Sequence, residues 1–182
     1  MVKLDYKQFE DYAFSLVHAT PYYIYEGIAS IFCLGLVVFI AWKGFKTGLR
    51  YSAALLLIEY IFLLFCSTVI FRPIGETRQY DFHPFWSYDR PELLVENIMN
   101  VVVFIPVGLL FGIAFKQIIW WKALLIGCGI FVAIKSLQFF FMRGFSEVDY
   151  VMHNTFGCVV GYIISCILLN LLTKTKLKLD YA

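Results

Sequence analysis

Charged residues are scarce in this chain. Asp, Glu, Lys and Arg make up 15% of its 182 residues, whereas hydrophobic residues make up 61%. A soluble domain normally carries about 25% charged residues, so the composition argues against a soluble globular protein. The net charge of +2 gives no sign of a polyanionic ligand, and we expect no nucleic-acid partner.

Several other features that would indicate a particular chemistry are absent. The five cysteines lie within apolar runs and form no C-x-x-C pair, so we interpret them as small hydrophobic residues. The sequence has no P-loop and no H-x-x-x-H motif. It also has no internal repeat of the kind that builds many transporters. We therefore expect no metal and no cofactor.

What the sequence has in abundance is long apolar runs. Each is near the length of about 20 residues that a membrane-spanning helix needs. We predict an all-α membrane protein with one membrane domain, residues 1–182, and five transmembrane helices at residues 22–42, 52–71, 98–115, 118–142 and 150–172. In residues 1–21, Phe9, Ala13, Leu16 and Val17 fall on one helical face, which favours a helix along the membrane interface.

The basic residues near the span ends predict an orientation. With the N-terminus outside, eight Lys and Arg residues lie on the inner side and six on the outer side, while Lys135 lies inside a span. An excess of basic residues marks the cytoplasmic side. We therefore expect residues 72–97 to form an extracytoplasmic loop and residues 173–182 a cytoplasmic tail. The expected location is the cell membrane, with membrane lipids as partners.

Three of the predicted spans carry polar side chains near their outer ends, where burial in hydrocarbon costs about 2.5 to 3.5 kcal/mol each. One interpretation is that these groups only hold helices together by hydrogen bonds. The other is a site near the outer surface, because acid, amide and cation converge from three helices. The candidate ligand-binding residues are Glu96, Asn97, Asn100, Gln138, Arg143, Asp149 and Asn154. Asp149 and His153 are the candidate catalytic residues.

Other residues inside the spans have structural interpretations. Glu59 lies near the middle of the second span, and a lone carboxylate is costly to bury, so it is either protonated or paired. The long stem of Lys135 favours an ion pair with Glu59. Spacings of small residues that let helix backbones approach closely occur twice. These small-residue pairs are Gly108 with Gly112, and Gly157 with Gly161.

The polar residues also fall into a pattern that resembles a known family. Asn100, Phe104, Pro106 and Gly108 match the N-x-x-x-F-x-P-x-G signature of VanZ-like membrane proteins. A second segment is similar to that family's Q…R…D…N-T-x-G-x-x-x-G pattern, and Pro84-Phe85 stands where the family commonly has a Pro-Phe. The residues of the second segment are Gln138, Arg143, Asp149, Asn154, Thr155, Gly157 and Gly161. The likeness covers roughly residues 52–170. Lys135 departs from it, because the family commonly has an acid three positions before the glutamine.

The resemblance implies a bacterial cytoplasmic-membrane protein. Some family members are associated with low-level resistance to lipoglycopeptide antibiotics such as teicoplanin. We expect a non-enzymatic cell-envelope factor that binds a lipid-linked or glycopeptide-type ligand at its outer face. The alternative is a small membrane enzyme acting on a polyprenyl or phospholipid head group, with Asp149 or His153 as general base and Arg143 holding phosphate. No recognised catalytic spacing supports the alternative.

Overall fold

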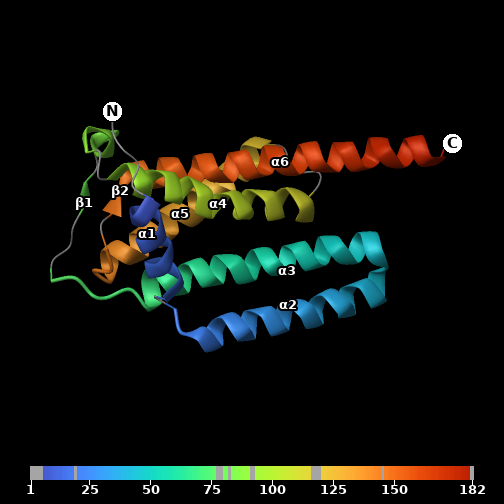
Figure 1. Ribbon diagram of the computed structural model, residues 1–182, viewed down its shortest axis with the longest axis horizontal. Coiled ribbons are helices and arrows are strands. Elements are labelled where there is room, and N and C mark those ends of the chain that lie inside the picture. The colour runs from blue at the N-terminus through green and yellow to red at the C-terminus, as the bar shows by residue number, and fades with distance from the viewer. Residues whose placement is uncertain are drawn as a thin grey trace.

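The structure is a computed structural model. It describes residues 6–18, 20–76, 80–81, 83–90, 93–115, 120–144 and 146–180. The helices are α1 (Tyr6–His18), α2 (Tyr22–Lys43), α3 (Phe45–Phe65), α4 (Leu94–Ala114), α5 (Trp120–Phe140) and α6 (Val148–Asp180). The shorter elements are the π-helix η1 (Cys66–Ile70), the strands β1 (Tyr80–Asp81) and β2 (Ser146–Glu147), and the 3-10 helix η2 (Trp86–Asp89). The long helices lie lengthwise in Figure 1, whereas α1 crosses their direction at one end.

Four helical segments of the described chain are long and apolar enough to cross a membrane. They are Tyr22–Lys43, Phe45–Ile70, Leu94–Ala114 and Val148–Leu172. A shorter apolar stretch, Leu124–Phe140, lies in α5. The prediction of a helical chain with several potential membrane spans is confirmed, and the number of such helices is four or five.

Some predicted boundaries differ from the observed ones. Helix α3 begins at Phe45 rather than at residue 52, and α4 begins at Leu94, so the residues just before 98 are helical rather than part of the loop. Helix α6 runs to Asp180 and so includes most of the predicted tail. The predicted start of the fourth span, residue 118, lies outside the described residues.

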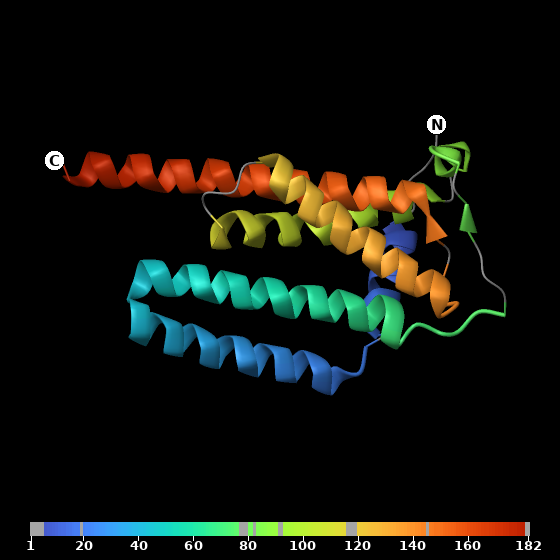
Figure 2. The same ribbon diagram turned by 180° about the vertical axis from the view of Figure 1, so that it is seen from behind.

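A single residue joins α2 to α3. Gly44 has φ 74° and ψ 169°, a conformation that is essentially limited to glycine. This residue reverses the chain direction between two helices, so residues 45–51, before the predicted start of the second span, are already helical. The two helices form the antiparallel hairpin that lies along one side of the bundle in Figures 1 and 2.

Helices α4 and α6 approach each other most closely at their glycines. A Cβ added to Gly157 or Gly161 would overlap the carbonyl oxygen of Val101 or Ile105, respectively. A Cβ on Gly108 would likewise meet the Cys158 carbonyl. These glycines therefore occupy the contact between the two backbones, where any side chain would push the helices apart.

Aromatic and aliphatic side chains fill the space between α3, α4 and α5. The rings of Phe104 and Phe131 pack edge to face, with centroids 4.2 Å apart, among other buried apolar residues that include Val107. Pro106 lies inside α4 and has no N–H to continue the helical hydrogen bonds. The Tyr60 hydroxyl of α3 donates to the carbonyl of Val103 nearby, at 2.8 Å.

A short parallel strand pair was not predicted from the sequence. Tyr80 pairs with Ser146 and Asp81 with Glu147. The pair joins the segment between α3 and α4 to the segment between α5 and α6. Both segments lie at the same end of the bundle, beside η2 and the start of α6 (Figure 2).

Candidate functional site

Helix α3 continues into the π-helix η1. Carbonyl groups in and just after η1 accept hydrogen bonds from one side chain near the end of α5 and from another that follows it. The Gln138 amide nitrogen donates to the Thr68 carbonyl at 3.0 Å. The Arg143 guanidinium donates to the carbonyls of Ile70 and Arg72. Carbonyls that a helix end leaves without a backbone partner need such donors, so these two side chains attach α3 to α5.

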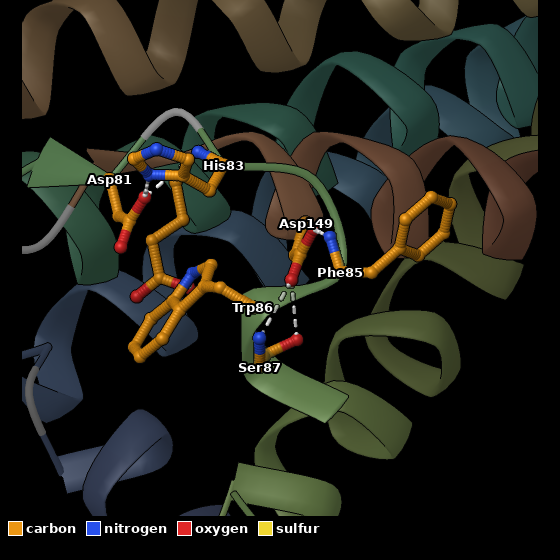
Figure 3. A network of polar contacts seen from close by, with 7 residues as sticks. Asp81, His83, Phe85, Trp86, Ser87 and Asp149 are labelled. Atoms are coloured by element: carbon orange, nitrogen blue, oxygen red, sulfur yellow. Dashed lines mark hydrogen bonds and ion pairs between the residues drawn. The ribbon is translucent and has the colours of Figure 1, made fainter. Parts of the chain in front are cut away.

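The most thoroughly buried acid in this region is Asp149, whose side chain has no exposed surface. Figure 3 shows it facing the segment that contains η2. Its carboxylate accepts hydrogen bonds from the Phe85 N–H at 2.6 Å, the Ser87 N–H at 3.0 Å and the Ser87 hydroxyl at 2.6 Å. The Asn97 amide donates to the same Ser87 oxygen at 3.1 Å. Asp149 therefore holds the loop onto the starts of α4 and α6.

The other candidate catalytic residue also contacts this loop. The Nε2 atom of His153 lies 2.8 Å from the Tyr88 hydroxyl, and the two rings lie 5.6 Å apart. Both Asp149 and His153 thus have partners in residues 85–88. Holding this loop in place is a structural role that accounts for the burial of both side chains.

Glu147 of β2 supports the loop from its other side. Its carboxylate accepts a hydrogen bond from the Trp86 indole at 3.0 Å. Burial raises the pKa of Glu147 from its usual 4.5 to about 7. The Lys135 ammonium and the Trp86 hydrogen bond lower this pKa, whereas the negative charges of Glu96 and Asp149 raise it further.

Asp81 and His83 form an exposed pair within the loop. Asp81 accepts a hydrogen bond from the His83 N–H at 2.8 Å and also contacts the His83 ring nitrogen at 2.8 Å (Figure 3). The backbone hydrogen bond, followed by the side-chain contact, lowers the pKa of Asp81.

A cavity of about 360 Å³ lies between the bundle helices next to this network. Part of its wall is apolar and includes Leu64, Phe104 and Phe131. Ala13 and Val17 of α1 also line it, so the apolar face predicted for residues 1–21 partly covers the cavity. The polar lining residues are Tyr25, Tyr60, Ser67, Thr68, Arg72, Glu96, Asn100, Lys135, Gln138, Tyr150 and Asn154.

Three amide side chains in the cavity wall have polar atoms without a hydrogen-bond partner among the described residues. These atoms are Nδ2 of Asn100, Oε1 of Gln138 and Oδ1 of Asn154. Gln138 is only 2% exposed and Asn154 only 6% exposed. Unpaired buried polar groups cost about 1 to 3 kcal/mol each, so the wall is suited to a ligand that supplies both acceptors and donors.

Among the described residues that line the cavity, the charged ones are two cations and one acid. Arg72, Glu96 and Lys135 all line it, and the Lys135 Nζ atom lies 3.9 Å from the ring centroid of Tyr150. The charges that act on Lys135 come from Arg72, Glu147 and Glu96. The prediction that Lys135 forms an ion pair with Glu59 is wrong. Within the described parts of the chain, both carboxyl oxygens of Glu59 lack a hydrogen-bond partner.

The structure separates the seven candidate ligand-binding residues into two groups. Glu96, Asn100, Gln138 and Asn154 line the cavity. Asn97, Arg143 and Asp149 do not; they bind loop or backbone atoms around it. The sequence placed all seven at the same depth, but depth alone does not show which way a side chain points.

Sequence reasoning missed several residues of the site. Tyr150 shares a helical face with Asn154, four residues later, and this signal was available. Arg72 follows directly after an apolar run. A position at the membrane interface was as consistent with the sequence as a position in the cavity wall. Nothing in the sequence singled out Ser87 as the partner of Asp149.

The sequence model of the VanZ/LLP1 family matches residues 53–169, which is more than half of the chain. The chain belongs to the VanZ/LLP1 family. No curated protein and no solved structure matches it. The VanZ/LLP1 match runs from α3 to α6 and contains the cavity-lining residues except Ala13, Val17 and Tyr25. Helices α1 and α2 thus add to a cavity built mainly from the family's own segment.

Replacing Asp149 by Asn should release the loop of this VanZ/LLP1 protein. The amide cannot accept all three hydrogen bonds, and we expect a loss of at least about 2 kcal/mol in stability, since bonds to a charged group are worth roughly 1.5 to 3 kcal/mol each. Chymotrypsin should then cut faster after Trp86, and thermal unfolding in detergent should occur at a lower temperature. Asp89→Asn, an exposed acid in the same loop, is the control. Equal cleavage of both variants would contradict the role of Asp149.

The raised pKa of Glu147 predicts a pH dependence. Between pH 4.5 and about 7 the folded protein keeps a proton that the unfolded chain releases, so stability should fall as the pH rises through this interval. Glu147→Gln should remove that part of the pH dependence of the unfolding temperature, whereas Glu76→Gln, at an exposed position, should leave it unchanged. Parallel pH profiles for wild type and Glu147→Gln would show that Glu147 is not responsible.

Proposed function

We propose that this VanZ/LLP1 membrane protein is a non-enzymatic cell-envelope factor that binds the polar head group of a membrane lipid in its central cavity. The observation that carries the proposal is the set of buried, unpartnered amide atoms on Asn100, Gln138 and Asn154. The same cavity is also lined by apolar residues, which include Leu64, Phe104 and Phe131. A wall that is polar on one part and apolar on another matches a molecule with a polar head and a hydrocarbon tail.

The size of the cavity supports a lipid head group over a whole glycopeptide. Small-molecule sites usually enclose about 300 to 1,000 Å³, and this cavity, at about 360 Å³, is near the lower limit. A role in low-level glycopeptide or teicoplanin resistance remains part of the proposal, through a lipid-linked ligand whose availability at the cell surface the protein changes.

The geometry gives less support to an enzyme acting on the same head group. A general base needs a free lone pair within reach of its substrate. The Asp149 carboxylate already accepts three hydrogen bonds from Phe85 and Ser87, and neither Asp149 nor His153 lines the cavity. Arg143 binds backbone carbonyls rather than facing the space where a phosphate would lie.

Asn154→Leu should weaken lipid binding while leaving the fold intact, because leucine is close to asparagine in size and the lost Oδ1 atom has no protein partner. We expect an affinity for phosphatidylglycerol lower by about fivefold, the effect of one hydrogen bond. Native mass spectrometry or calorimetry of the purified protein in detergent measures it.

The matched control is Asn170→Leu, which removes an exposed amide on the same helix. The same two variants should differ in teicoplanin susceptibility when expressed in cells. Unchanged phosphatidylglycerol affinity in Asn154→Leu would refute the proposed site.

We also propose that the cavity opens toward the extracytoplasmic side, with the N-terminus outside and the C-terminus in the cytoplasm. The support is the excess of basic residues on the opposite side, eight against six. Alkaline phosphatase fused to the C-terminus should therefore be inactive, while a green fluorescent protein fused there should fluoresce. High phosphatase activity would reverse the orientation.

A further inference from the structure

A second hollow, the lateral groove, lies on the outside of α5. It is formed by Val132, Ser136, Phe139 and Phe140 of α5 together with Glu147, Val148 and Val151, and its volume is about 360 Å³. Phe140 is 67% exposed and Val132 is 49% exposed. Val132 and Phe140 belong to the apolar stretch Leu124–Phe140, so an exposed apolar part of α5 borders the groove.

Lys135 connects the lateral groove with the central cavity. It lines both spaces, and its ammonium lies 3.9 Å from the ring of Tyr150, which belongs to the cavity wall. The Lys135 position is therefore where a molecule in the cavity and a molecule in the groove come together. Among the described residues that line the cavity, Arg72 is the second cation and Glu96 is the acid.

We propose that one anionic lipid occupies both spaces, with its phosphate-bearing head group in the central cavity and one hydrocarbon chain in the lateral groove. This inference rests on the proposed function, which it extends to a class of lipid and to a position for its chain. Arg72 and Lys135, which both line the cavity, can form charged hydrogen bonds with a negative head group. The hydrocarbon chain of the lipid must lie outside the central cavity, because the buried amides of the cavity wall need polar partners that a hydrocarbon cannot supply.

The groove is suited to that chain. Its wall is mostly apolar, and an alkyl chain is bound by burial of apolar surface, which grows with each methylene group. The long stem of Lys135 can lie beside the chain while its ammonium reaches the phosphate.

Two substitutions test the groove. Ser136→Trp and Val132→Trp place a large ring in it, since both residues line it and are exposed. Ala133→Trp puts the same ring at an exposed position of α5 outside the lining and is the control. The purified full-length protein is titrated with dioctanoyl phosphatidylglycerol and with glycerophosphoglycerol, its head group without chains.

We expect both groove variants to bind dioctanoyl phosphatidylglycerol about tenfold more weakly, which the lost burial of two or three methylene groups is enough to produce. Their affinity for glycerophosphoglycerol should stay at the wild-type value, and Ala133→Trp should match wild type with both probes. A thermal unfolding transition shows that each variant is folded. If one of the two groove variants does not fold, the other alone is enough for the test.

Three results would overturn the inference, and they separate its failure from that of the proposed function. If the groove variants bind the lipid normally while Asn154→Leu binds it weakly, the chain leaves by another side and the cavity site stands. If the groove variants weaken both probes equally, the ring has disturbed the cavity and the groove holds no chain. If Asn154→Leu also binds both probes normally, the cavity site and the inference fail together.

Discussion

The buried carboxylate of Asp149 is the interaction on which the polar end of this protein depends. It lies at the start of α6 and accepts two backbone N–H groups and one hydroxyl from residues 85 and 87. A buried carboxylate is stable only when its lone pairs are used in this way. The bonds fix η2 over the ends of α4 and α6, and Asn97 extends the same network to α4. Without this attachment the loop would keep only its other contacts with this end of the bundle, which include Trp86 with Glu147, Tyr88 with His153 and the pairing of β1 with β2.

The close contact of α4 and α6 has a consequence for the cavity. The glycines at 108, 157 and 161 bring the two backbones together. Asn100 and Asn154 lie near the starts of these two helices, and both line the cavity. A wider separation between the helices would move the two amides apart. Close backbone packing, which alone has no chemical function, thereby sets the distance across the proposed lipid site.

Lys135 is the position at which this chain departs from the family pattern, and its place in the structure suggests what the departure does. A lysine stands where VanZ-like proteins commonly have an acid, and it lines both the central cavity and the lateral groove. It has no pairing with Glu59, whose carboxyl oxygens lack partners in the described part of the chain. With Arg72 it gives the cavity two cationic side chains, and these are the basis for our proposal of an anionic lipid as the ligand.

The sequence by itself determined the helical class, the several membrane-length apolar runs and the family resemblance, because hydrophobicity and residue spacing are local properties. It also identified most of the polar residues near one end of the bundle. Only the tertiary structure decided their roles, since these depend on side-chain direction and on partners distant in sequence. Asp149 meets Ser87 across 62 positions and Gln138 meets Thr68 across 70, and no periodicity within one helix reports such a contact. For the same reason, Glu96, Asn100, Gln138 and Asn154 line the cavity, whereas Asn97, Arg143 and Asp149 support its surroundings.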